Sequence, residues 1–180
     1  EDRQTVLEKI HGIPQVDRIE VRMVENRGRN IAPLLVEFGR LFQNYDYICH
    51  FHTKKSIYTG EEKTGWRQYL FERLLGSQDT IHTILTAFEK DPKIGIICPE
   101  IYPYLPYWAC TWLSNKGIAA SILQRLNILF DPDDYFDYPV GSMFWIRKKA
   151  LDPLLSLGLT TSDFPVEQGQ TDGTLHHTLE

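Results

Sequence analysis

The amino-acid sequence predicts an α/β protein whose mostly parallel sheet is flanked by helices. Segments with strand periodicity alternate with helical ones along the 180 residues, a pattern typical of parallel sheets. The composition, 42% hydrophobic and 24% charged, is that of a soluble domain with its own core. We therefore expect residues 1–180 to form one domain. Because the first residues of this domain already have a helical pattern, we expect the domain to be part of a longer polypeptide.

Four segments have the pattern of strands. Residues 18–24 alternate apolar Ile19, Val21 and Met23 with polar neighbours, the period of a half-buried strand. The other three are short apolar runs, which is typical of strands buried on both faces. They cover residues 45–51, 93–100 and 141–147.

The segments between these strands have helical patterns. Pro33 falls in the first turn of one helix, where proline is tolerated. Ser77 or Asp79 can cap another, whose apolar residues follow the 3.6-residue period. In order, helices are expected over residues 5–10, 31–43, 66–76, the segment after Ser77, 117–129, 148–158 and the end of the chain from about Asp172.

Charge and cysteine content narrow the class of protein. A formal net charge of −5 provides no basic surface for nucleic acid. Cys49, Cys98 and Cys110 are widely spaced, which fits reduced thiols and a cytoplasmic protein. No apolar run reaches the roughly 18 residues of a membrane span, and no signal peptide opens the sequence.

A glycine turn follows the first predicted strand, and ligands of α/β sheets bind beyond such strand ends. Gly28 can adopt positive φ, so the turn can present backbone N–H groups, together with arginine side chains, to an anion. The alternative is an ordinary turn with solvated arginines. The candidate donor-binding residues here are Glu25, Asn26, Arg27, Gly28 and Arg29.

Two histidines end the second predicted strand. Alternation places His50 and His52 on one side of it, with Lys54 and Lys55 just beyond. The histidines can hold a metal ion, but the neighbouring lysines favour a diphosphate. A third possibility is that both imidazoles bond loop backbone and the lysines are solvated.

Other candidate residues lie nearer the C-terminus. Asp172 or Glu167 can take a proton from a hydroxyl, although Asp172 also stands where a helix N-cap belongs. Glycine and serine before the last strand allow a ligand to approach the backbone closely. Aromatic rings of residues 101–112 can stack on a sugar or form a satellite core. The remaining candidates are Gly141 and Ser142 for the donor, and Trp108, Gln170 and His176 for the acceptor.

Six ordered blocks resemble the rhamnan synthesis protein F family of bacterial polysaccharide assembly. They are "ENRGRNIAPLL", "YDYICHFHTKKS", "GWRQYLFERLLGS", "GIICPE", "GSMFWIRKKAL" and "DFPVEQGQTDGTLHH". The resemblance implies a glycosyltransferase with a GT-A-like (Rossmann-like) fold, here lacking its first strand. This sequence departs from the family pattern at Asn30, where aspartate is usual, and at residues 50–52, which replace an Asp-x-Asp metal motif.

The resemblance also implies a reaction. L-Rhamnose would pass from a dTDP-activated donor to a polysaccharide or lipid-linked saccharide acceptor, at the inner face of the bacterial membrane. Lys54 and Lys55 would neutralise the diphosphate, with Mg²⁺ or Mn²⁺ as a candidate cofactor, and Asp172 or Glu167 would be the base of an inverting attack. Two alternatives remain: a zinc-dependent hydrolase built on His50 and His52, and a non-catalytic sugar-binding module.

Overall fold

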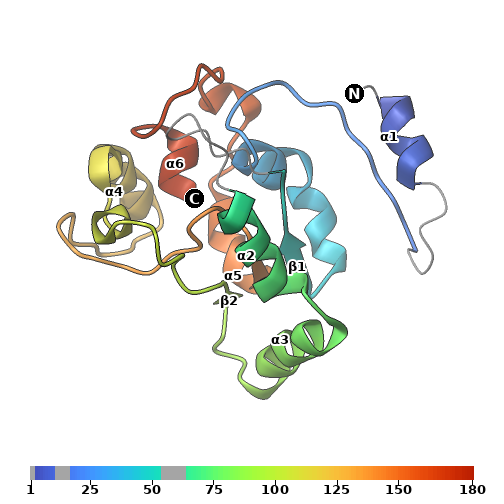
Figure 1. Cartoon of the computed structure of the whole chain (residues 1–180). Helices are drawn as coiled ribbons and strands as arrows, with labels where there is room; N and C mark the ends of the chain where they lie inside the picture. The colour runs from blue at the N-terminus through green and yellow to red at the C-terminus, as the bar shows by residue number, and fades with distance from the viewer. Residues whose placement is uncertain (1–2, 11–16, 54–63) are drawn as a thin grey trace.

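A three-stranded sheet forms the centre of the fold. The computed structural model describes residues 3–10, 17–53 and 64–180. Strand β3 (Phe144–Arg147) lies between β1 (Tyr47–His50) and β2 (Ile96–Ile97), and it runs antiparallel to both. Figure 1 labels the two outer strands. Because β3 contacts both other strands, it determines where each of them lies.

The expected mostly parallel, GT-A-like (Rossmann-like) sheet is wrong. The two outer strands run in the same direction, as their alternation with helices predicts, but they are not neighbours. β3 enters between them in the opposite direction after a long excursion over residues 98–143. A connection of that length imposes no strand direction, so sequence alternation alone could not reveal the antiparallel pairing.

The strand expected over residues 18–24 is also absent. This segment is not part of the sheet, and the side chain of Met23 is 68% exposed. An alternating pattern forms a strand only where a neighbouring strand can pair with it, because an isolated extended segment has no partner for its peptide groups. No described residue supplies that neighbour here.

Most predicted helices are confirmed, although the predicted helix over residues 31–43 divides at Phe38. Its first half is a π-helix, η1 (Pro33–Glu37), and its second a 3₁₀ helix, η2 (Gly39–Asn44). Ser77 caps its helix as predicted, its Oγ accepting from the Thr80 N–H at 3.0 Å. The α-helices are α1 (Arg3–Ile10), α2 (Thr64–Leu75), α3 (Gln78–Lys90), α4 (Lys116–Arg125), α5 (Lys148–Ser156) and α6 (Leu175–Leu179), and the further 3₁₀ turns are η3 (Tyr107–Cys110), η4 (Leu113–Asn115) and η5 (Thr161–Asp163).

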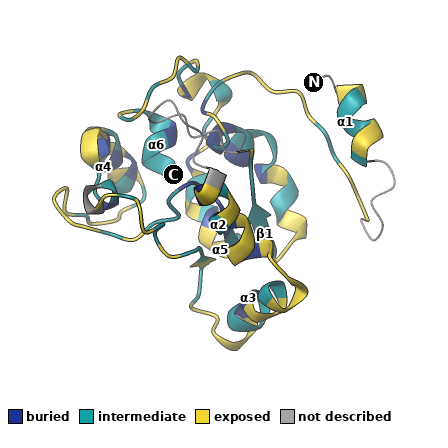
Figure 2. Cartoon of the chain, viewed as in Figure 1, coloured by how far each residue is buried: buried dark blue, intermediate teal, exposed yellow. Residues whose placement is uncertain are grey.

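Two hydrophobic clusters cover the two faces of the sheet. Figure 2 shows which segments of the chain are buried. On one face, η1 and α5 pack against Ile48, Phe144 and Ile146. On the other, α2 and α3 pack against side chains that include Tyr47 and Trp145. Successive strand residues point to opposite faces, so β1 and β3 contribute to both clusters, whereas β2 contributes Ile97 to the second.

The turn after residues 18–24 packs against the C-terminal tail, which comprises residues 161–180. Gly28 has φ +60°, and a Cβ at that position would lie 2.5 Å from Cδ1 of the fully buried Phe164. The same Cβ would lie 2.6 Å from the Cβ of Ala32. Glycine is therefore required here both by the backbone conformation and by the close approach of the phenyl ring.

We expect Gly28→Ala to lower the free energy of unfolding by about 3 kcal/mol, the sum of positive-φ strain and overpacking. Chemical denaturation measures this loss. Gly158→Ala is the matched control, because Gly158 has φ +64° but open space where its Cβ would stand. It should lose only the strain contribution of about 1 kcal/mol. Equal losses in the two variants would contradict close packing at Phe164.

Candidate functional site

His50 and His52 lie on the same side of β1, as the alternation of its side chains predicts. His50 Nδ1 lies 2.6 Å from the Ser142 carbonyl oxygen, and His52 Nε2 lies 2.9 Å from that of Gly141. A carbonyl can only accept a hydrogen bond, so these two nitrogens carry the protons. The other ring nitrogen of the neutral His50, Nε2, is then a hydrogen-bond acceptor. Backbone bonding by both histidines was one of the three possibilities left open by the sequence.

The carbonyls that the histidines bind belong to a tight turn before β3. Gly141 has φ +98° and Ser142 has φ +53°, which is uncommon for a residue other than glycine. Ser142 is fully buried, and its hydroxyl donates to the carboxylate of Glu180. The turn therefore connects the end of β1 with the C-terminal end of the chain.

His50 is neutral at physiological pH. Burial lowers its pKa from 6.5 to about 4, and this effect outweighs the opposite effect of its hydrogen bond to Ser142. A neutral imidazole adds no positive charge for a diphosphate. The cations predicted to do so, Lys54 and Lys55, lie outside the described residues.

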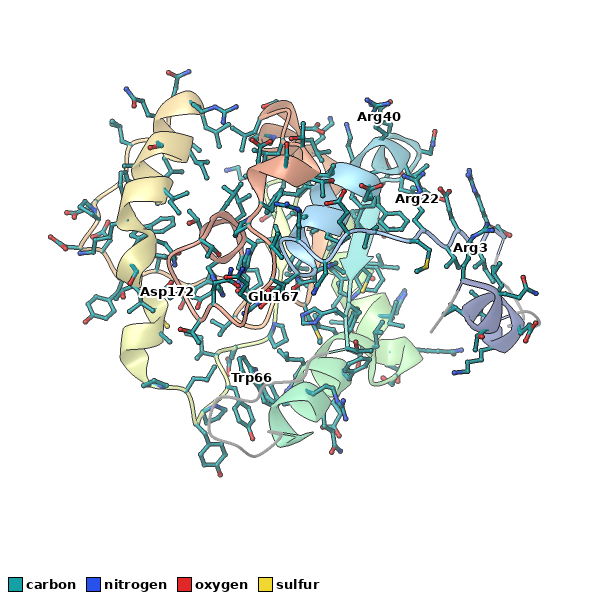
Figure 3. All side chains as sticks on the ribbon, turned by 90° about the horizontal axis from the view of Figure 1, so that it is seen from above. Arg3, Arg22, Arg40, Trp66, Glu167 and Asp172 are labelled. Atoms are coloured by element: carbon teal, nitrogen blue, oxygen red, sulfur yellow. The ribbon has the colours of Figure 1, made fainter. Side chains whose placement is uncertain are left out.

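The glycine turn of residues 25–30 is held by the C-terminal tail. Arg29 Nε lies 2.9 Å from Glu167 Oε2, and Arg29 also donates to the Gln170 carbonyl. The Glu167 N–H donates to the Asn26 carbonyl at 3.0 Å. Figure 3 shows Glu167 in the middle of the molecule, with Asp172 to one side. The hydrogen bond from Arg29 lowers the pKa of Glu167, so this carboxylate is ionised and paired.

Arg27 has partners within the chain as well. Its Nη1 donates to the Phe164 carbonyl at 2.8 Å, and its Nε lies 3.1 Å from Glu25 Oε2. Both arginines predicted to receive an anion thus already face a carboxylate. A ligand at this turn would have to compete with those ion pairs.

Asp172 connects the tail to η4, a role that the sequence did not reveal. Its Oδ2 accepts from the Ser114 N–H at 2.8 Å, and its Oδ1 accepts from Asn115 Nδ2 at 2.6 Å. The N-cap of α6 is Thr174, so the expected capping role of Asp172 is wrong. Asn115 belongs to no periodic pattern, and its partners are 57 or more positions away, so no local signal could have identified it.

Two adjacent histidines in α6 complete the network. His176 is 2% exposed, and burial lowers its pKa from 6.5 to about 4. Burial also lowers the pKa of His177, against the charges of carboxylates that include Glu180 and Asp172. His177 Nδ1 lies 2.7 Å from the Thr174 hydroxyl, whereas its buried Nε2 has no hydrogen-bond partner.

Most of the predicted site residues are therefore brought into one network. The Gly141–Ser142 turn binds His50 at the end of β1 and His52 just beyond it, Glu180 binds that turn, and α6 carries the histidines that interact with the tail carboxylates. Gln170 lies inside the tail loop, where its Nε2 donates to the Val166 carbonyl at 2.8 Å. The Trp108 side chain is outside what the structure describes.

A hollow of about 350 Å³ opens beside β1. It is mostly apolar, with a few polar groups at its wall. One of these is the side chain of Asn30, whose buried Nδ2 has no hydrogen-bond partner. The lining residues are Asn30, Pro33, Leu34, Phe38, Phe42 and the five consecutive residues 48–52.

The described residues contain no metal-binding cluster. No three histidine, cysteine, aspartate or glutamate side chains converge within them. A catalytic zinc site uses three protein ligands, so the predicted zinc-dependent hydrolase has no ligand set in this part of the chain. His50 and His52 alone could supply two nitrogen ligands to a weakly held ion, which leaves the predicted metal-binding role a prediction.

Comparison with known proteins identifies the family. The family model described as "Rhamnan synthesis protein F" matches residues 1–180. This chain belongs to the rhamnan synthesis protein F family. The family is named for polysaccharide synthesis, so involvement in that process is supported.

Two curated relatives of this family member are both named "Uncharacterized protein WxcX". They come from Xanthomonas campestris pv. campestris, strains B100 and ATCC 33913, and each is 38% identical over 162 residues. The match covers 89% of this chain but only 23% of either relative, so the chain spans less than a quarter of their length. No solved structure matches it. None of the helices in the described ranges has the length and apolar character needed to cross a membrane.

We expect the free energy of unfolding to fall by about 2 kcal/mol per buried histidine between pH 7 and pH 5. The pKa values of His50 and His176 are lowered from 6.5 to about 4 by folding. Above pH 6.5 both are neutral in the folded and unfolded chain. As the pH falls from 6.5 towards 4, only the unfolded chain takes up the protons, so stability decreases.

Urea denaturation at a series of pH values measures this dependence. His176→Gln should remove its share of the slope, while His82→Gln, on an exposed position of α3, is the matched control. A slope unchanged by His176→Gln would contradict the neutral, buried state of His176.

Proposed function

We propose that this chain is the catalytic part of a glycosyltransferase that transfers L-rhamnose, or a related deoxyhexose, from a dTDP-activated donor to a growing cell-surface polysaccharide. Family membership supports a role in polysaccharide synthesis. The donor, the inverting mechanism, the acceptor and a cytoplasmic location at the inner membrane face are parts of the proposal.

The observation that best supports this proposed function is the network that joins the end of β1 to the C-terminal tail. Group transfer requires donor and acceptor to be held side by side, with a base within hydrogen-bond reach of the acceptor hydroxyl. The contacts through Ser142 and Glu180 put the β1 histidines and the tail carboxylates on connected elements. Under this proposal, two groups that are far apart in sequence would act on one substrate pair.

Asp172 is the base that we favour. Its two oxygens accept from neutral donors, the Ser114 N–H and the Asn115 amide, and each oxygen keeps a second lone pair. Glu167 is paired with the charged Arg29 and also accepts from the Gly169 N–H at 2.8 Å. That pairing makes Glu167 a weaker base and a better anchor for the tail.

The β1 histidines fit hydroxyl recognition better than charge neutralisation. Neutral His50 offers Nε2 as an acceptor for a sugar hydroxyl. The diphosphate would then depend on Lys54 and Lys55. When a divalent cation binds with the donor, it would share the charge of the diphosphate, and His50 and His52 are the residues that would hold it.

We expect dTDP-rhamnose to stabilise the polypeptide expressed from its complete reading frame. At one hundred times the dissociation constant, the gain is about 2.7 kcal/mol, which raises the Tm by roughly 5–10 °C. A thermal-shift panel with dTDP-glucose and dTDP, with and without Mn²⁺, measures selectivity. Changing both Lys54 and Lys55 to alanine should abolish the shift, whereas changing both Lys90 and Lys93, exposed at the end of α3, should not. An equal shift with every nucleotide would contradict the deoxyhexose donor.

We expect Asp172→Asn to lower kcat by about 10²–10⁴-fold with little change in the KM for the donor, because it removes the base and leaves the donor site intact. Transfer to a saccharide acceptor measures both constants.

Asn115→Ala is the matched control for this variant. It removes the bonds that the Asn115 side chain forms with Asp172 and Gly173 but keeps the carboxylate of Asp172. Its kcat should stay within about tenfold of the parent. If the two variants lose activity equally, Asp172 has only a structural role and the base must be sought elsewhere.

A further inference from the structure

Every second peptide group of β1 points away from the sheet. The Lys148 N–H donates to the Asp46 carbonyl at 2.9 Å, which marks this pair as hydrogen-bonded. In an antiparallel pair, hydrogen-bonded and non-bonded positions alternate, so Ile48 and His50 also bond to β3. The N–H and C=O groups of Tyr47, Cys49 and Phe51 therefore face outward. No described residue forms a backbone hydrogen bond with any of these three.

The hollow beside β1 lies along this same edge. Five consecutive residues, 48–52, line it. Three of them, residues 48–50, belong to β1, where successive side chains point to opposite faces, so the hollow meets the strand along its backbone edge. The opposite wall is apolar and comes from η1, η2 and the residues before them: Pro33, Leu34, Phe38 and Phe42.

Unpaired strand edges of this kind bind extended polypeptide. A row of outward N–H and C=O groups, two residues apart, matches the pairing groups of one added strand. The apolar wall would contact alternate side chains of that strand, which selects apolar residues at every second position. A small rigid ligand would satisfy only part of the row and leave buried peptide groups unpaired.

We propose that the open edge of β1 binds an extended, alternately apolar segment of the same polypeptide, lying outside these 180 residues. The length of the relatives supports that source, since this chain matches only 23% of either. A tethered segment has an effective concentration near the millimolar range, so it occupies the edge ahead of free partners. This proposal does not depend on the reaction proposed above.

Hydrogen exchange measured by NMR tests the proposal. In residues 1–180 alone, the amides of Ile48 and His50 should exchange slowly, and those of Tyr47, Cys49 and Phe51 rapidly. In the polypeptide expressed from its complete reading frame, these three should exchange at least about a hundredfold more slowly, because they are paired within a sheet.

A proline at position 49 tests the pairing directly. Cys49→Pro removes an outward N–H and spares the ladder to β3, and edge strands tolerate proline. In the complete polypeptide it should abolish the added protection at Tyr47 and Phe51. The matched control is Ile96→Pro. The Arg147 N–H donates to Gly95 at 2.8 Å, so Ile96 faces outward from the other edge of the sheet, and this proline should leave the protection at β1 unchanged.

Three results would overturn the proposal, and none of them needs a variant. One is equal exchange of Tyr47, Cys49 and Phe51 in the two polypeptides. Another is protection in residues 1–180 that rises with protein concentration, which would assign the edge to a second copy. The third is protection that appears only when dTDP-rhamnose is added, which would assign the hollow to a small ligand.

Discussion

The buried turn at Gly141 and Ser142 is the constraint on which the rest of the molecule depends. Two successive residues with positive φ cost on the order of 1–3 kcal/mol for the one that is not glycine. Three hydrogen bonds offset that cost, from His50, His52 and the Ser142 hydroxyl itself. The turn starts β3, and β3 positions both other strands. This turn thus holds together the sheet, the histidines His50 and His52, and the C-terminal end of α6.

This constraint shapes the chemistry available at the site. The same burial that stabilises the turn keeps His50 neutral, so it can accept a hydrogen bond but cannot attract a phosphate. Arg27 and Arg29 are each paired with a carboxylate, so neither offers an unpaired positive charge at this site. The polar groups of the described site therefore suit neutral hydroxyls, as a saccharide offers, better than an isolated anion.

The edge of β1, which has no backbone partner among residues 3–10, 17–53 and 64–180, and the candidate site share one strand. His50 takes part in both, since its backbone pairs with β3 and its side chain binds the Ser142 carbonyl. An added strand would cover the apolar wall of the hollow and exclude water from the side of β1 next to the histidines. Lower polarity strengthens every electrostatic interaction there, so completing the sheet would also complete the environment of the site.

The sequence by itself determined the local structure and the family. Ser77 as a cap, the opposite facing of Cys49 and His50, and the ordered motifs of the rhamnan synthesis protein F family all depend on residues close together in the chain. Only the tertiary structure decided the direction of β3, the lack of a strand at residues 18–24 and the bond between Asp172 and Asn115. Each of these depends on whether, and how, two segments far apart in the sequence pair with each other. Such pairings are chosen by which packed arrangement satisfies the most buried groups, and that choice leaves no periodic trace in the sequence.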